Sequence, residues 1–303
     1  MPSEIDTKER ESDTKEGEPK LKSPKLETDD GTVAALHEHL VEHGIEEIAD
    51  HSQLRVPQIY QVVRHEGETE MARPATSLWW SGVAAGLSIT FSVFAEAVLH
   101  HYLPEAGWRP LLTGFGYSAG FLLVVLARQQ LFTENTITAV LPVVASPSGK
   151  NLYRLARLWG IVFAANLTGT LIAALFSTFA PVPIPEIRET IIEISHHAVA
   201  HGFFESIFTA IPAGFLIAAM VWLMPSAETA RFHVVTLVTY IIAIGGFSHI
   251  IVGSFEAFML LLNGEIGIGT MLTHFTIPVL IGNVIGGTAL FALLAYAQVM
   301  KEV

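Results

Sequence analysis

The sequence contains no cysteine, so neither a disulfide bond nor a thiolate metal site is available to this protein. Charged residues are also scarce: they make up 15% of the chain, whereas soluble domains usually carry about a quarter. The opening residues, MPSEIDTKER, hold no apolar core, so we expect no secretory signal peptide and expect the first membrane helix to direct insertion. Together these shortages indicate a membrane protein.

Apolar residues are abundant instead, at 51% of 303 residues with a mean hydropathy of +0.47, and charge is concentrated near the N-terminus. Residues 1–73 hold eighteen Asp or Glu and nine Lys or Arg, while the rest of the chain holds eleven and eight. We therefore divide the chain into an acidic cytoplasmic N-terminal arm, 1–73, and a transmembrane transport domain, 74–303. Within the arm, disorder is predicted over 1–30, and short amphipathic helices are predicted around Val33–Ala49 and Gln58–Ala72.

Long apolar segments predict the membrane helices, since a spanning helix needs about 20 mainly apolar residues. The second and fifth segments are too long for one straight span and contain polar or glycine-rich interruptions. Between the third and fourth segments, PIPEIRETIIEISHHAVAH has apolar residues at helical spacing, which predicts an amphipathic helix at the membrane surface. The six segments are Leu78–Leu99, Leu111–Ala145, Leu158–Ala180, Phe203–Met224, Val234–Leu262 and Met271–Val299.

The distribution of Lys and Arg over the loops predicts the orientation of these spans. With the N-terminus inside, the outer loops receive only Arg109 and Arg188. Both termini of this multi-pass protein are therefore expected in the cytoplasm. The inner side then receives Arg73, Lys150, Arg154, Arg157, Arg231 and Lys301.

The two halves of the transport domain resemble each other. AANLTGTLIAALF (Ala164–Phe176) aligns with IGNVIGGTALFAL (Ile281–Leu293), and upstream LFTEN (Leu131–Asn135) corresponds to GFSHI (Gly246–Ile250). Because each half holds three helices, the halves must have opposite orientations in the membrane. The fold class predicted is thus all-α, with six transmembrane helices in an inverted 3+3 repeat and broken helices two and five.

The two interruptions are the candidate functional site. A broken helix leaves backbone groups unpaired, which a membrane tolerates only where they are buried in protein or face a water-filled cavity. We expect the two breaks to meet near the midplane, where His249 is the first candidate because an ionisable residue inside a membrane is a functional candidate by default. Thr133 is expected to occupy the position equivalent to that of His249 and to support the same ligand. Phe132, Phe247 and Ser248 complete the predicted constriction.

Other polar residues near the breaks have more than one interpretation. Asn166 and Asn283 are predicted to hydrogen-bond across helices, and Asn135 to be structural near the pore. Arg128 and Glu134 pair either with each other or with a neighbour, because an unpaired buried charge would be costly. Glu96 and Glu256, alone in apolar segments, face either a vestibule or a subunit interface.

The cluster His196, His197 and His201 with Glu193 has the spacing of metal ligands on a helix. Without thiols or a further carboxylate pair, we favour an interfacial helix or an anion-concentrating vestibule, and predict no metal site and no cofactor.

The predicted constriction suits a small monovalent anion of a weak acid. A bare anion entering a dry passage loses several kcal/mol of solvation. A proton on a weak acid such as formic or nitrous acid removes most of that penalty, and a histidine can pass such a proton. The predicted function is therefore a channel or transporter, not an enzyme, with a small anion, protons and lipid as partners and no nucleic acid.

Several motifs together resemble the formate/nitrite transporter family. They are LFT-x-N at the first break, GF-x-H at the second, MVWL (Met220–Leu223) late in the fourth span and IGN-x-IGG in the sixth, and the resemblance covers about Ser77 to Val299. The stretch ARQQLFTENTITAVLPVV and the acidic arm look like an uncharacterised inner-membrane branch. The resemblance implies a homopentamer with an aquaporin-like fold and one pore in each protomer, with His249 as the central pore histidine, Thr133 as the loop threonine and Phe132 in a constriction.

This chain departs from the better-studied members of the family at three places. Arg128 and two glutamines precede LFT in place of small and acidic residues, and Gly214 falls where a pore-facing Asn is usual. No Lys occurs between Lys150 and Lys301, so the electropositive role of a Lys before the fourth span could pass to the histidine cluster.

Two rival functions are a neutral-solute channel of the aquaporin type and a membrane scaffold with a vestigial pore. The first predicts Asn-Pro-Ala at both breaks, which neither LFTEN nor GFSHI supplies. The second predicts that the arm, not His249, is needed for function. A membrane enzyme would have only the histidine cluster to support it.

Overall fold

The computed structural model describes residues 54–302, and throughout this range every regular element is a helix. The helix predicted around Val33–Ala49 and the disorder predicted over 1–30 lie outside the described residues. The prediction of an all-α membrane protein is confirmed.

Five helical stretches within residues 54–302 are long and apolar enough to cross a membrane. Three shorter apolar stretches lie between them: α6 with α7 (Asn135–Thr138 and Val140–Ala145), α11 (Arg231–Ile244) and α12 (Ile250–Leu262). A count of six spans requires α11 and α12 to be halves of one span, and this count stays a prediction. The five are α3 with α4 (Ala75–Ile89 and Phe91–Tyr102), α5 (Arg109–Leu126), α8 (Gly149–Phe179), α10 with η2 (Phe203–Leu223 and Met224–Ser226) and the run from α13 to α15 (Ile268–Val299).

The last run contains wider turns of π-helix. It consists of α13 (Ile268–Thr270), η3 (Met271–Thr276), α14 (Ile277–Val284), η4 (Ile285–Ala292) and α15 (Leu293–Val299), of which η3 and η4 are π-helical. Such turns are frequent at functional sites.

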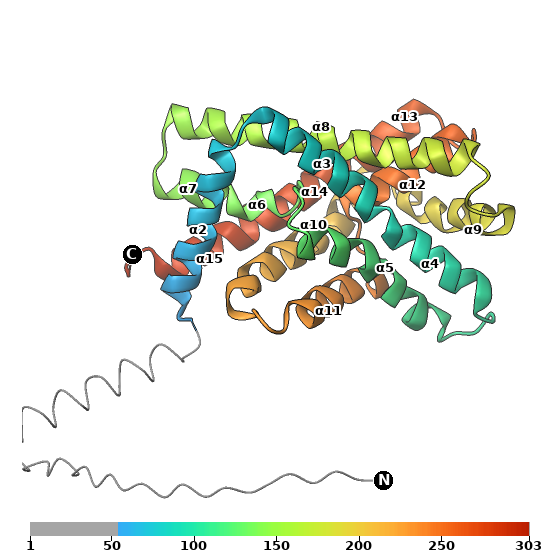
Figure 1. Cartoon of the computed structure of the whole chain (residues 1–303), viewed down its shortest axis with the longest axis horizontal. Helices are drawn as coiled ribbons and strands as arrows, with labels where there is room; N and C mark the ends of the chain where they lie inside the picture. Colours follow the sequence, from blue (N-terminus) through green and yellow to red (C-terminus); the bar gives the residue numbers. More distant parts are fainter. Residues whose placement is uncertain (1–53, 303) are drawn as a thin grey trace, which may run out of the picture. The chain divides into compact units, whose positions relative to one another are not determined.

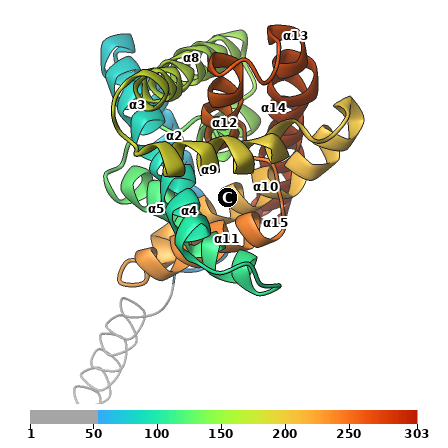
Figure 2. The ribbon, with the colours of Figure 1, turned by 90° about the vertical axis from the view of Figure 1, so that its right-hand side faces the viewer.

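Two surface helices mark opposite ends of the helix assembly (Figure 1). α2 (Val56–Ala72) packs against α6, α7 and α15, whereas α9 (Pro185–Ser195) packs against α4 and α12 and continues into the short turn η1 (His196–Val199). Figure 2 shows α9 lying across the helix ends on its side. We call these two sides the α2 end and the α9 end.

α2 is amphipathic. Ile59, Val63 and Met71 are buried on one side of it, while Arg64 and Glu68 form an exposed ion pair of 3.0 Å on another. Gly67 sits so close to α6 that an added Cβ would overlap the Thr138 carbonyl oxygen. The helix therefore packs directly on the membrane helices, and the division of the chain at residue 73 stays a prediction.

Candidate functional site at the two helix breaks

The chain leaves the helical conformation in the same way at both interruptions. α5 and α11 each end in a Schellman motif, in which the residue after the helix cap is left-handed: Arg128 has φ +53° and Gly246 has φ +63°. The paired hydrogen bonds also correspond. The N–H of Gln129 donates to the Val124 carbonyl at 3.0 Å, and the N–H of Phe247 donates to the Ile242 carbonyl at 3.1 Å.

A buried asparagine completes the first break. The Asn166 side chain on α8 accepts the N–H of Phe132 at 2.9 Å and donates to the carbonyl of Gln130 at 2.8 Å. Its amide also donates to the Gly82 carbonyl on α3 at 2.8 Å. One amide thus satisfies backbone groups on both sides of the interruption and fastens the break to a neighbouring helix.

Asn283 on α14 repeats this pattern at the second break. It accepts the N–H of Ile250 at 2.8 Å and donates to the carbonyls of Ser248 at 2.9 Å and Ala210 at 2.8 Å. Each amide thus joins one break to a neighbouring helix, α3 for Asn166 and α10 for Asn283. Both N–H donors of each amide are engaged by backbone carbonyls, so neither side chain can donate to a ligand without giving up a backbone partner.

These hydrogen bonds correct the alignment of the two breaks. Sequence similarity pairs Leu131 with Gly246, whereas the asparagines pair Phe132 with Ile250 and hence Leu131 with His249. Thr133 is therefore not the positional equivalent of His249. The short motifs LFTEN and GFSHI share one Phe, and aligning on it shifts the comparison by three residues.

His249 and Thr133 nevertheless meet across the two breaks. Nε2 of His249 lies 2.8 Å from Oγ1 of Thr133, and both side chains are buried. Nδ1 of His249 accepts the N–H of Val252 at 3.3 Å and so caps α12. Because Nδ1 is an acceptor, the neutral ring carries its proton on Nε2, donates it to Thr133, and leaves the threonine hydroxyl hydrogen free for another acceptor.

Phe121 on α5 is a neighbour of His249 that sequence analysis missed. It is fully buried, and its ring centroid lies 5.1 Å from that of His249 at an edge-to-face angle of 76°. On this side the ring of His249 therefore contacts the ring of Phe121 and not water. No sequence signal separates Phe121 from the exposed Phe115 in the same apolar run.

The other predicted constriction residues lie at the breaks but contact different groups. Phe132 packs edge-to-face on Trp159 and Phe163 of α8, with centroids 5.7 and 5.1 Å away. Ser248 hydrogen-bonds through Oγ to Thr209 at 3.1 Å. Phe247 is half-buried, and its ring lies against Gly245. A gating role for either Phe stays a prediction.

Asn135 belongs to the wall around the first break. Its side-chain amide donates to the Leu131 carbonyl at 3.0 Å and to Gln130 Oε1 at 3.2 Å, and its backbone carbonyl accepts the indole N–H of Trp159 at 3.0 Å. These bonds hold the chain around Leu131, and a structural role for Asn135 stays a prediction.

Gly214 lies in a helix contact. An added Cβ would overlap the Asn283 backbone on α14, as one on Gly86 would overlap the Asn166 backbone on α8. The two glycines hold equivalent places in the two halves. A longer side chain at position 214 would therefore meet the α14 backbone before any pore surface.

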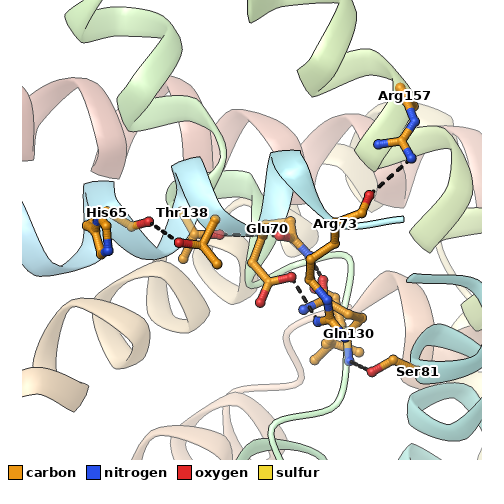
Figure 3. Close-up of polar contacts among 10 residues, drawn as sticks. His65, Glu70, Arg73, Ser81, Gln130, Thr138 and Arg157 are labelled. Carbon is orange, nitrogen blue, oxygen red and sulfur yellow. Dashed lines mark hydrogen bonds and ion pairs between the residues drawn. The ribbon is translucent and has the colours of Figure 1, made fainter. Parts of the chain in front are cut away.

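The charged residues of the first break face α2. Arg128 is exposed and lies 3.7 Å from Glu66 of α2, so of the two pairings left open the structure has the one with a neighbour. Figure 3 shows the ion pair of Glu70 with Arg73 at the end of α2, at 2.9 Å. The Glu134 carboxyl has a buried oxygen without a hydrogen-bond partner among the described residues.

The histidine cluster at the α9 end is spread over separate carboxylates. His196 lies 3.7 Å from Glu265, and His201 lies 3.1 Å from Glu205. Glu193 instead lies 3.8 Å from His100 of α4. In residues 54–302 no three such side chains are arranged to hold a metal ion.

Comparison with known proteins identifies relatives of this arrangement. A sequence profile described as formate/nitrite transporter matches residues 57–297. The inner membrane protein YfdC of Escherichia coli K12 is 41% identical over 248 residues, covering 82% of this chain and 80% of the relative. The formate channel FocA of the same organism is 24% identical over 269 residues, covering 80% and 93%.

Two solved structures share the fold. One, described as a pentameric formate channel with formate bound, superposes with a TM-score of 0.63 at 23% identity and covers 75% of this chain and 98% of its own. Another, described as an FNT family ion channel, gives a TM-score of 0.69 at 16% identity and covers 80% and 98%.

Proposed function

The chain belongs to the formate/nitrite transporter family, and on that premise we propose that it conducts small monovalent weak-acid anions across the inner membrane, linked to protons through His249. Relatives named as formate channels support the substrate class. The family match favours transport over a scaffold with a vestigial pore.

The observation that carries the proposal is the contact between His249 Nε2 and Thr133 Oγ1, at 2.8 Å. This pair joins the two breaks, and both residues are buried. The free hydroxyl hydrogen of Thr133 is a donor for an oxyanion such as formate. A buried donor is worth more there than in water because the local dielectric is low.

Proton exchange follows from the same geometry. A proton that reaches the ring binds to Nδ1, and the hydrogen bond that Nδ1 accepted from the N–H of Val252 is lost. The Nε2 proton then moves to Thr133 Oγ1 while the threonine hydroxyl proton moves to the anion. The ring ends neutral, with its proton on Nδ1, and the acid that forms has no net charge to desolvate.

Uptake into proteoliposomes tests this function. We expect formate and nitrite to enter vesicles containing the full chain, faster at external pH 5 than at pH 8. His249→Ala and Thr133→Val should each reduce the proton-linked flux by about tenfold or more, since positioned proton transfer contributes on the order of a hundredfold or more.

His233→Ala is the matched control, because this exposed histidine lies in the first turn of α11, at the opposite end of that helix from the break. It should leave the flux and its pH profile unchanged. An unchanged pH profile in His249→Ala would contradict the histidine mechanism, and absence of any anion flux in the wild type would contradict the proposed function.

We also propose that five copies assemble, each with its own pathway. The relative described as pentameric supports this by fold. At most half of each candidate span is buried within one chain, which leaves wide apolar surfaces for lipid and neighbouring copies. The mass of the detergent-solubilised protein, measured by native mass spectrometry, gives the number of subunits.

A further inference from the structure

Two carboxylates and a phenol lie inside the membrane helices at positions that the His249–Thr133 pair does not use. Glu96 is on α4, Tyr117 on α5 and Glu256 on α12. Tyr117 lies beside Glu96, because a Cβ on the preceding Gly116 would overlap the backbone nitrogen of Glu96, and α4 also contacts α12, which carries Glu256. Of the two places that the sequence left open for these carboxylates, this grouping favours an internal vestibule.

The group continues the row of residues that starts at His249. Glu256 follows His249 by about two turns of α12, on the same face and about 10 Å farther along the helix. On α5, the ring of Tyr117 lies 5.5 Å from that of Phe121, which in turn lies 5.1 Å from His249. Tyr117, Glu256 and Glu96 thus lie on the α9 side of the pair.

A buried hydroxyl near Glu96 also indicates that this group serves a ligand. Tyr117 is only 8% exposed, and its ring packs against that of Phe121 with centroids 5.5 Å apart. Ser92, one turn before Glu96 on α4, is fully buried, and within residues 54–302 its hydroxyl has no hydrogen-bond partner. Buried hydroxyls are normally hydrogen-bonded, so the unpartnered Ser92 hydroxyl on the helix that carries Glu96 is a place where an exchanging species can bind.

No described Lys or Arg forms an ion pair with either carboxylate. Two neighbouring carboxylates in a low dielectric cannot both stay ionised without a counterion. Glutamate oxygens alone fall short of the six or more ligands that Mg²⁺ and Ca²⁺ take. A proton is the counterion that two carboxyl groups can hold by themselves.

The other charged and titratable groups on the surrounding helices lie farther toward the α9 end. His100 contacts both Arg109 of α5 and Glu193 of α9, and so is already engaged. These groups are His100, His101 and Tyr102 on α4, Arg109 on α5, Glu186, Arg188, Glu189 and Glu193 on α9, His196 and His197 on η1, and His274 on η3; those of α8, namely Lys150, Tyr153, Arg154 and Arg157, lie in its first turns instead.

We propose that Glu96, Tyr117 and Glu256 form a proton-donor site for the permeating anion on the α9 side of His249. The inference rests on the proposed function and names where its proton comes from. The O–H bond of one protonated carboxyl breaks, its electron pair stays on the carboxylate, and the proton moves through intervening water to Nδ1 of His249, where an N–H bond forms. The pair of His249 and Thr133 then protonates the anion as described above, and a proton from water at the α9 end reprotonates the carboxyl pair.

Proton-coupled uptake in proteoliposomes tests the site. The probe is formate, with internal pH recorded by a trapped dye and formate entry by radiolabel. Glu256→Gln keeps the shape of the side chain but cannot transfer a proton, so formate-linked proton entry at pH 6 should fall about tenfold. Glu96→Gln should have the same direction, and Glu256→Asp, which keeps a carboxyl, should restore most of the flux.

Glu186→Gln, an exposed carboxylate in the first turn of α9, is the control and should behave as wild type. Proton entry and pH profile unchanged in both Gln variants, with wild-type formate flux present, would overturn the proton-donor site alone. Wild-type vesicles that pass no weak-acid anion would overturn the proposed function and this site with it. Elution of each variant at the wild-type size excludes misfolding as the cause.

Discussion

Arg128 occupies a left-handed backbone position at which glycine is the usual residue. Among the described residues it is the one non-glycine residue with a positive φ, and its counterpart in the second half is Gly246. The left-handed conformation costs a residue with a Cβ on the order of 1 kcal/mol. The exposed ion pair with Glu66 at 3.7 Å offsets part of this cost, because such pairs contribute at most about 1 kcal/mol.

Arg128→Gly should therefore stabilise the protein, raising its melting temperature in detergent by about 2 °C because the backbone strain disappears. Glu66→Gln separates the two effects: it removes the ion pair, leaves the backbone strained, and should lower the melting temperature slightly or not at all. Thermal unfolding followed by intrinsic fluorescence measures both. A lower melting temperature for Arg128→Gly would mean that the ion pair outweighs the strain.

Sequence reasoning identified residues whose chemistry is unusual in a membrane. His249, Thr133, Asn166 and Asn283 are polar groups in apolar segments, and burial forces such groups into hydrogen bonds. Phe121 could not be found this way, because an apolar residue in an apolar run carries no signal of what it contacts. Contacts across the breaks depend on tertiary packing, which no local pattern contains.

At the scale of helices, small residues determine how closely the elements approach. α8 crosses α3 where Gly169 meets Gly86, and η4 crosses α10 where Gly286 meets the Ile211 carbonyl. The same construction in both halves brings each asparagine to its break. Membrane helices commonly pack through such small residues.

Gly169→Ala should destabilise the protein by about 1–3 kcal/mol, because its Cβ would overlap the Val83 carbonyl oxygen of α3. Gly160→Ala on the same helix is the control, since no atom lies within 4 Å of a Cβ there. It should be neutral or slightly stabilising, as alanine favours helix. The yield of folded protein and its melting temperature measure both effects. Equal effects of Gly169→Ala and Gly160→Ala would contradict the close crossing of α8 and α3.

The positions of the helices could be predicted from the lengths of the apolar segments, whereas the alignment of one break with the other could not. α9 lies within the segment predicted to be amphipathic, and α10 spans Phe203–Leu223 where Phe203–Met224 was expected. The break alignment was wrong because a shared Phe is weaker information than the backbone hydrogen bonds that Asn166 and Asn283 make. Those bonds join residues far apart in sequence.

For the molecule as a whole, the first and last described helices lie on one side. α2 packs against α15, and the rings of Tyr60 and Tyr296 have centroids 6.0 Å apart. Burial raises the pKa of Tyr60 above its usual value, as expected for a residue packed between these helices. The C-terminus and α2 must therefore share a side of the membrane, whichever side that is.

The loop charges predict that both termini lie in the cytoplasm. In that orientation the inner loops hold Arg73, Lys150 and Arg231, and the outer loops hold Arg109 and Arg188. A green fluorescent protein fused after Val303 should therefore fluoresce, and alkaline phosphatase inserted after Gly107, between α4 and α5, should be active. Phosphatase inserted after Ser148, ahead of α8, is the control and should be inactive. An active phosphatase at Ser148 with an inactive one at Gly107 would reverse the orientation and put the Glu96–Tyr117–Glu256 group on the cytoplasmic side of His249.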